Sequence, residues 1–287
     1  MRIVLVSYAA NGFAVLHRTC ERAGHTPVAY LHARSLRPRG PARGGAGETV
    51  AGIVDALPDG VDLLLPGRTG ALAAGLRAQD ADLMVCYGFP WRFPAAALAA
   101  TRLGALNVHT SLLPRYRGPL PIHWAVRNGD PETGVTVHRM DERFDTGNVL
   151  VQEGGVRLPD DVVPAVLFEE VDRVIGRLLP TALERAAAGD PGEPQDSAGA
   201  SYAGWWEPSF STVDWGWPAR RIHDQVRALR FGSSGRSGPR ARLDGARVTV
   251  LRTSLVPAPG VEVACGDGPL WVTEFTSDAE PDGHRLA

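Results

Sequence analysis

Three polar side chains stand out in this sequence because of their chemical types and their spacing. Asn107 and His109 are two residues apart at the end of the apolar run LGALNVH, and Asp145 lies in the polar segment DERFDTG. Side chains repeat every two residues along a strand, so we expect Asn107 and His109 to point the same way. An amide and an imidazole that face one cleft can stabilise an oxyanion and move a proton.

The carboxylate of Asp145 is the natural partner for this pair. It follows the strand-like run TGVTVHRM, and neighbouring loops could bring it close to His109. A carboxylate at that place would raise the pKa of the imidazole and fix its tautomer. The spacing leaves an alternative open, in which His109 is a structural histidine and the carboxylates of this segment (Asp141, Glu142 and Asp145) are solvated turn residues.

The sequence around these residues resembles the formyltransferases that use 10-formyltetrahydrofolate. The resemblance rests on NVHTSLLPRYRG (107–118), on PIHWAVRNGDPETGVTVHRM (121–140) and on Asp145-Thr146-Gly147. Methionyl-tRNA formyltransferase, glycinamide ribonucleotide transformylase and the amino-sugar formyltransferases belong to this family, and the aminoarabinose branch is the most similar. VDWGWPARRIHDQVRAL (213–229) and ARVTV (246–250) resemble the C-terminal domain of the tRNA and aminoarabinose members.

The resemblance implies that Asn107, His109 and Asp145 are catalytic. An amine would attack the formyl carbon, and Asn107 and protonated His109 would stabilise the oxyanion of the tetrahedral intermediate, at about 3 kcal/mol per donor. It also implies a folate site lined by the turn after His109 and by two further loops. These predicted folate-binding residues are Trp91, Arg92, Phe93, Ser111, Leu112, Leu113, Pro114, Asp141, Glu142, Arg143 and Phe144.

Several of these assignments have plain structural alternatives. Trp91 and Phe93 could instead be ordinary core residues. Arg117 either braces its loop, meets an anionic group or is a loop-surface arginine. Trp205 and Trp206 could stack a flat acceptor or pack a domain interface. The segment HARSLRPRGPARGGAGE, with four arginines, is either a solvated loop or an anion-binding loop for phosphate or RNA (Arg34, Arg37, Arg39 and Arg43).

The elements that must position these residues follow an alternating pattern. MRIVLVSY, PVAYL, ADLMVCYG and LGALNVH read as strands, and helical patterns such as NGFAVLHRTCERAG and 167–189 lie between or after them. This alternation predicts an α/β fold with a Rossmann-like, mainly parallel sheet, whose strands present ligand-binding residues at their carboxyl ends. The segment DPGEPQDSAGAS reads as a linker. We therefore expect a catalytic domain over 1–195 and a shortened, β-rich, OB-like domain over 196–287.

Composition narrows the function further. The net charge is −2, so no global electrostatic field attracts nucleic acid. All 30 basic residues are arginines, so no lysine is available for a Schiff base. The three cysteines are far apart, which argues against a disulfide framework, and no residue set has metal-ligand spacing. With no membrane-length apolar run and no signal-peptide pattern at the start, a cytoplasmic location without membrane contact is expected.

The sequence thus predicts an N-formyltransferase that moves a formyl group from 10-formyltetrahydrofolate, without a metal, to the amine of a small molecule. An amino sugar, an amino acid or a carrier-bound aminoacyl group would fit. Three alternatives are methionyl-tRNA formylation, hydrolysis of the formyl donor and a non-catalytic folate or nucleotide-binding module. SYAANG after the first strand and the absence of lysine from the basic loop depart from the tRNA enzymes. Pro119 and Trp205-Trp206 depart from the aminoarabinose branch, where arginines are expected, and the oligomeric state is left open.

Overall fold

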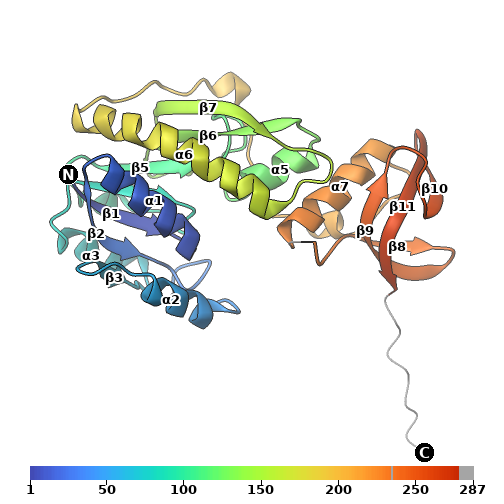
Figure 1. Ribbon diagram of the computed structural model, residues 1–287, viewed down its shortest axis with the longest axis horizontal. Helices are drawn as coiled ribbons and strands as arrows, with labels where there is room; N and C mark the ends of the chain where they lie inside the picture. Colours follow the sequence, from blue (N-terminus) through green and yellow to red (C-terminus); the bar gives the residue numbers. More distant parts are fainter. Residues whose placement is uncertain (234, 278–287) are drawn as a thin grey trace, which may run out of the picture. The chain divides into compact units, whose positions relative to one another are not determined.

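The computed structural model of the protein describes residues 1–233 and 235–277, and it divides into two compact units (Figure 1). The first unit comprises Met1–Pro121, Thr133–Val156 and Glu169–Ala203. The second comprises Ile122–Glu132, Arg157–Phe168 and the chain from Gly204 onward. Because compactness alone does not test independent folding, the domain boundary expected after residue 195 stays a prediction.

The first unit is built on a seven-stranded sheet in the order β3-β2-β1-β4-β5-β6-β7. The pairs β2–β3, β1–β2, β1–β4 and β4–β5 are parallel, whereas β6 runs antiparallel to β5. This arrangement confirms the predicted Rossmann-like, mainly parallel sheet. The strands are β1 (Arg2–Ser7), β2 (Thr26–Leu31), β3 (Asp62–Leu64), β4 (Leu83–Tyr87), β5 (Ala105–His109), β6 (Glu132–Arg139) and β7 (Val149–Arg157).

Helices cover both faces of this sheet. On one face Phe13 of α1 stacks on Tyr30 of β2, with ring centroids 4.3 Å apart. On the other face the buried Val4 and Val6 of β1 share a hydrophobic cluster with Leu72 and other residues of α3 and α4. The helices of this unit are α1 (Ala10–Arg22), α2 (Ala46–Asp55), α3 (Leu72–Arg77), α4 (Ala95–Leu98) and most of α6 (Pro164–Ala187), with the short 3-10 helices η1 (Thr69–Ala71) and η2 (Ser197–Gly199).

The second unit pairs a helix with an antiparallel sheet, which confirms the predicted β-rich C-terminal region. Its sheet has the order β10-β11-β9-β8 and packs Val250, Leu270 and Val272 against Ile222 and Val226 of the helix. The elements are α5 (Pro121–Arg127), η3 (Pro208–Ser211), α7 (Ala219–Gly232), β8 (Arg240–Leu243), β9 (Ala246–Ser254), β10 (Val261–Cys265) and β11 (Gly268–Ser277).

The strand order of the first sheet reverses direction between β1 and β4, and the carboxyl ends of β1, β4 and β5 lie along one edge. Such an edge is where open α/β sheets hold their ligands. Asn107 and His109 lie at the carboxyl end of β5 and therefore at this edge. Among the described residues, no helix has both the length and the apolar character needed to cross a membrane.

Candidate active site

The structure brings Asn107, His109 and Asp145 into one cluster, in which His109 and Asp145 are buried and Asn107 is half-buried. Asn107 Nδ2 donates a hydrogen bond to Asp145 Oδ1 at 3.1 Å, and His109 Nδ1 lies 3.6 Å from Asp145 Oδ2. β6 runs antiparallel to β5 with His138 opposite Asn107, and the turn that follows β6, 141–147, brings Asp145 within reach of both β5 side chains. The three residue types that were singled out in the sequence are therefore neighbours in space.

Asp145 is held in place by backbone groups as well as by side chains. Its φ of 56° lies in the left-handed region, which a non-glycine residue adopts only when its surroundings enforce it. The N–H of Gly118 donates to Asp145 Oδ2 at 2.7 Å. Burial alone would raise the pKa of this carboxyl, but the positive charge that His109 gains in acid and the hydrogen bond from the Gly118 N–H outweigh burial and lower the pKa to about 2. Asp145 is ionised at neutral pH.

The electrostatics of His109 correct one expectation from the sequence. Asp145 does favour the charged imidazole, but burial of the ring is the larger effect, so the net pKa of His109 is lowered below its ordinary value. The ring is 5% exposed, and Nε2 lies 2.8 Å from the carbonyl oxygen of Tyr116. A carbonyl only accepts, so Nε2 carries the proton. In the resting site His109 is neutral, and the lone pair on Nδ1 is on the side of Asp145.

The sequence analysis missed His138, which completes the cluster. It lies on β6 directly opposite Asn107, is 2% exposed, and places Nε2 3.2 Å from Asn107 Nδ2 and 3.5 Å from Asp145 Oδ1. The signal was present in the sequence. His138 ends the apolar alternation of TGVTVHRM, and antiparallel pairing with LGALNVH sets it beside Asn107.

The two loops that were expected to enclose a folate ring are joined by Arg92. Its guanidinium, which is exposed, donates from Nε and Nη2 to the carbonyl oxygen of Glu142, at 3.0 and 2.5 Å. Trp91 and Phe93, in contrast, are each 3% exposed and belong to the core cluster under the sheet, with Trp91 Nε1 bonded to the Ser35 carbonyl. These two rings shape the loop from within rather than offering a surface.

The second loop divides in the same way between structural and outward-facing residues. Asp141 accepts hydrogen bonds from the Arg143 N–H and the Thr146 hydroxyl, at 2.7 to 2.8 Å, and so closes the turn before Asp145. Glu142, Arg143 and Phe144 are exposed, and the exposed fraction of Phe144 is 38%.

In the turn after His109, residues 111–114, only Leu112 has an exposed side chain. Leu112 is 36% exposed, whereas Ser111 is 1% exposed and donates to the Arg115 carbonyl at 2.6 Å. Leu113 is buried, with its N–H bonded to the Thr136 hydroxyl at 3.2 Å, and the bond to Pro114 is cis. This backbone is fixed by the sheet.

Arg117 braces the site, as one of the readings of the sequence had it. Its Nε and Nη2 donate to Gln195 Oε1 at 3.0 and 2.7 Å. Gln195 Nε2 in turn donates to the carbonyls of Asp145 and Gly147, at 3.0 and 2.7 Å. A side chain far along the chain thus fixes the backbone of the turn that carries the carboxylate.

The four arginines of the loop after β2 are exposed, and Arg43 lies over the ring of Tyr8 at 3.9 Å. A hollow of about 480 Å³ is lined by Arg39, Arg68 and neighbouring residues of this region.

The two adjacent tryptophans, Trp205 and Trp206, differ in their surroundings. Trp206 stacks on Trp124 at 5.8 Å within the second unit, whereas Trp205 is 62% exposed.

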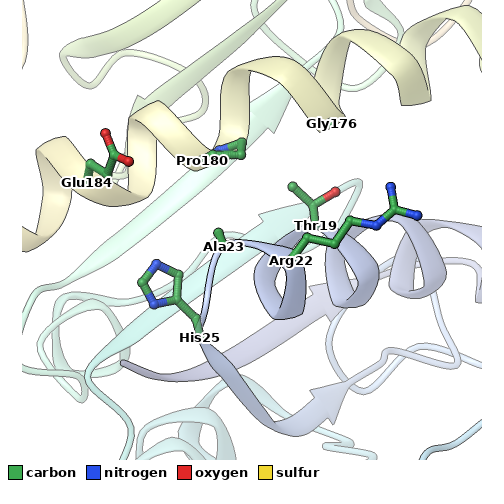
Figure 2. Close-up of a pocket in the computed structure, with 7 residues that line it drawn as sticks. All are labelled: Thr19, Arg22, Ala23, His25, Gly176, Pro180 and Glu184. Carbon is green, nitrogen blue, oxygen red and sulfur yellow. The ribbon is translucent and has the colours of Figure 1, made fainter.

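A separate cavity of about 350 Å³ lies between α1 and α6 (Figure 2). Figure 2 shows Thr19 and Arg22 of α1 opposite Pro180 and Glu184 of α6. This end of α1 precedes the start of β2, so the cavity lies towards the amino ends of the parallel strands and away from the Asn107–Asp145 cluster. Over the described residues, no group of three or more His, Cys, Asp or Glu side chains could hold a metal ion.

Comparison with known proteins agrees with this geometry. Residues 1–166 match the family model described as formyl transferase. The chain is 36% identical to the methionyl-tRNA formyltransferase of Symbiobacterium thermophilum over 281 residues, covering 91% of this chain and 83% of the relative. The chain belongs to the formyl transferase family. It is an enzyme that transfers formyl groups.

Solved structures agree with this assignment at the level of the fold. A 4-N formyltransferase from Francisella tularensis superposes with a TM-score of 0.65 at 16% identity, covering 87% of this formyltransferase and 96% of that chain. HypX from Aquifex aeolicus in complex with tetrahydrofolic acid gives a TM-score of 0.62 at 18% identity. That match covers 97% of the formyltransferase, which spans 44% of the length of HypX.

Proposed function

We propose that this formyltransferase moves the formyl group of 10-formyltetrahydrofolate to a primary amine at the Asn107–His109–Asp145 cluster. The observation that carries the proposal is the burial of an ionised carboxylate beside a neutral imidazole and an amide. Attack of an amine on a formyl carbon creates an oxyanion and releases a proton. An imidazole next to a carboxylate is suited to that proton.

His109 performs the proton step in this proposal. Its Nε2 proton is donated to the Tyr116 carbonyl, so the neutral ring has its lone pair on Nδ1, which can accept the proton that the attacking amine loses. The imidazolium that forms is stabilised by the ionised Asp145. His109 then returns the proton to the nitrogen that leaves the formyl carbon, which restores the neutral ring.

The surrounding loops fit a flat heteroaromatic donor. Leu112 and Phe144 offer exposed apolar side chains on two of the three segments around the cluster, and Arg92 ties the third segment to Glu142. Apolar walls with a few fixed polar groups are typical of sites for such rings. We keep all the folate-binding residues predicted from the sequence in this proposal. Within that set, Trp91, Phe93, Leu113 and Asp141 support the loops from inside.

For the acceptor we propose the amine of a small molecule. The net charge of −2 gives no overall attraction for a polyanion, and the turn after β1 and the basic loop depart from the tRNA enzymes. Charged initiator tRNA is the second candidate. It is favoured by the exposed arginine loop and by relatives named methionyl-tRNA formyltransferase, one of which, from Anaeromyxobacter dehalogenans, is 36% identical across 98% of this chain.

Turnover of 10-formyltetrahydrofolate, followed by absorbance against a panel of amines and charged tRNA, tests this proposal. We expect transfer to at least one amine, and His109→Ala should lower kcat by at least ~10²-fold while leaving the Kd for the folate within about threefold. Release of formate without any acceptor would identify a hydrolase instead. Unchanged turnover in His109→Ala would remove the cluster from the reaction.

A further inference from the structure

His138 has no assigned part in the reaction, yet it contacts two of the three proposed catalytic side chains. It faces Asn107 across the β5–β6 ladder and is almost completely buried. Its Nδ1 lies 2.7 Å from the carbonyl oxygen of Arg139, and its Nε2 lies 3.2 Å from Asn107 Nδ2. A residue placed in this way controls what the amide of Asn107 can do.

The hydrogen-bond partners fix the tautomer of His138. The Arg139 carbonyl can only accept, so Nδ1 carries the proton and donates it. Asn107 Nδ2 can only donate, so its hydrogen bond to His138 at 3.2 Å requires Nε2 to be the acceptor, with its lone pair towards the amide.

The same reasoning fixes the amide of Asn107. Asp145 is ionised and accepts only, so the Asn107 atom that faces Asp145 Oδ1 at 3.1 Å is the nitrogen. Both amide hydrogens of Asn107 are therefore used, one by His138 and one by Asp145. Asn107 Oδ1 has no hydrogen-bond donor among the residues that the structure describes, so it is the atom left for a substrate.

We propose that His138 is a positioning residue, which holds the Asn107 amide so that Oδ1 accepts an N–H of the attacking amine. This rests on the proposed function and assigns a role within it. As the amine nitrogen bonds to the formyl carbon, the C=O electron pair moves to the oxygen and positive charge grows on the nitrogen. Asn107 Oδ1 holds one N–H of that nitrogen and aims its lone pair at the carbon, while the proton that is lost goes to His109. Asn107 thus acts as an acceptor, in place of the oxyanion donor that the family resemblance implies.

Two variants separate positioning from simple packing. His138→Gln keeps an acceptor within reach of Asn107 Nδ2, and His138→Phe fills the same space without one. We expect His138→Phe to lower kcat by roughly 10–100-fold, as is usual for loss of an orienting partner. Its Kd for 10-formyltetrahydrofolate should stay within about threefold, and His138→Gln should recover most of the lost kcat. Equal losses in the two variants, or no loss in His138→Phe, would overturn the proposal.

A second readout does not depend on turnover. In ¹⁵N-labelled enzyme the Asn107 side-chain NH₂ signals are identified by their disappearance in Asn107→Ala. They should move strongly in His138→Phe and stay close to the wild type in His138→Gln. If neither variant moves them, His138 does not orient the amide. If His138→Phe melts below the assay temperature, His138→Met supplies the same test, because it also fills space without an oxygen or ring-nitrogen acceptor.

The design keeps this inference distinct from the proposed function. Transfer that His109→Ala abolishes and His138→Phe leaves intact would uphold the reaction and reject the role of His138. Absence of transfer in the wild type to every acceptor would reject the proposed function, while the NH₂ signals would still decide whether His138 orients Asn107.

Discussion

At the scale of single residues, the charge states of Asp145 and His109 are set by the balance between burial and specific neighbouring groups. Asp145 is nearly buried and would resist ionisation, but His109 and the Gly118 amide reverse that preference. His109 is buried to the point that Asp145 does not keep it charged at rest. The pair therefore holds one negative charge and an uncharged base, which is the state in which a proton can be accepted from an amine.

Asp145 makes an acid-stability prediction at this scale. Its folded pKa of about 2 lies below the ordinary value of 3.8, so its stabilisation is complete above pH ~5 and is lost as pH falls from about 4 to 2. At about 1.4 kcal/mol per pKa unit, wild type should lose about 2 kcal/mol of unfolding free energy over that range through this residue. Urea unfolding at several pH values should show a shallower acid slope for Asp145→Asn than for wild type.

The exposed Asp59→Asn is the matched control and should keep the wild-type slope. If Asp145→Asn also kept that slope, the carboxylate would have the same pKa folded and unfolded, and the ionised resting state would be wrong.

At the scale of elements, the site depends on close packing of the turn 141–147 against the carboxyl end of β6. Asp141 closes the turn from inside, and Gln195, itself fixed by Arg117, holds its far end. Gly147 is required where the turn passes β6. A Cβ there would lie 1.9 Å from the carbonyl oxygen of Arg139, which is backbone and has no room to yield.

Gly147→Ala should therefore displace the turn. We expect a loss of about 1–3 kcal/mol in unfolding free energy, as for other overpacked sites, and a fall in kcat larger than that of any equally destabilised surface variant. Thermal unfolding and steady-state kinetics measure the two effects. Gly52→Ala is the control, because Gly52 lies in α2 with open space at its Cβ, and alanine there should stabilise by roughly 0.5–1 kcal/mol. Wild-type kinetics in Gly147→Ala would show that the turn tolerates the shift.

The sequence predicted most strands of the first sheet and the three proposed catalytic residues, but it did not predict two residues that form hydrogen bonds with them. The alternation of apolar runs and helical patterns predicted the parallel strands, and the two-residue period placed Asn107 and His109 on one side of β5. Gln195 and His138 were missed for different reasons. His138 becomes visible only through the register of an antiparallel pair, and Gln195 lies in a segment whose polar composition reads as a linker. Trp91 and Phe93 show the opposite limit, since composition does not say which face of a loop is buried.

At the scale of the whole molecule, the charge distribution bears on which acceptor the enzyme serves. The net charge is small, but Arg34, Arg37, Arg39 and Arg43 are exposed together in one loop of the first unit. Such a loop can attract a polyanion locally without an overall basic charge. Arg39 also borders the 480 Å³ hollow with Arg68, where a smaller anionic group could be held.

Salt dependence separates the two acceptors. If a small amine is the substrate, kcat/KM should change by less than about threefold between 50 and 200 mM salt, because no condensed counterions are released. A tRNA acceptor held by four arginines would release about three counterions, so the same change of salt would lower kcat/KM on the order of 50-fold. Replacing all four loop arginines with glutamine should then flatten this dependence and lower kcat/KM at low salt for tRNA, and leave small-amine transfer nearly unchanged. The control replaces four exposed arginines elsewhere in the first unit: Arg18, Arg77, Arg102 and Arg173. A steep salt dependence in the wild type that the loop variant loses and the control keeps would replace the small-molecule proposal with tRNA.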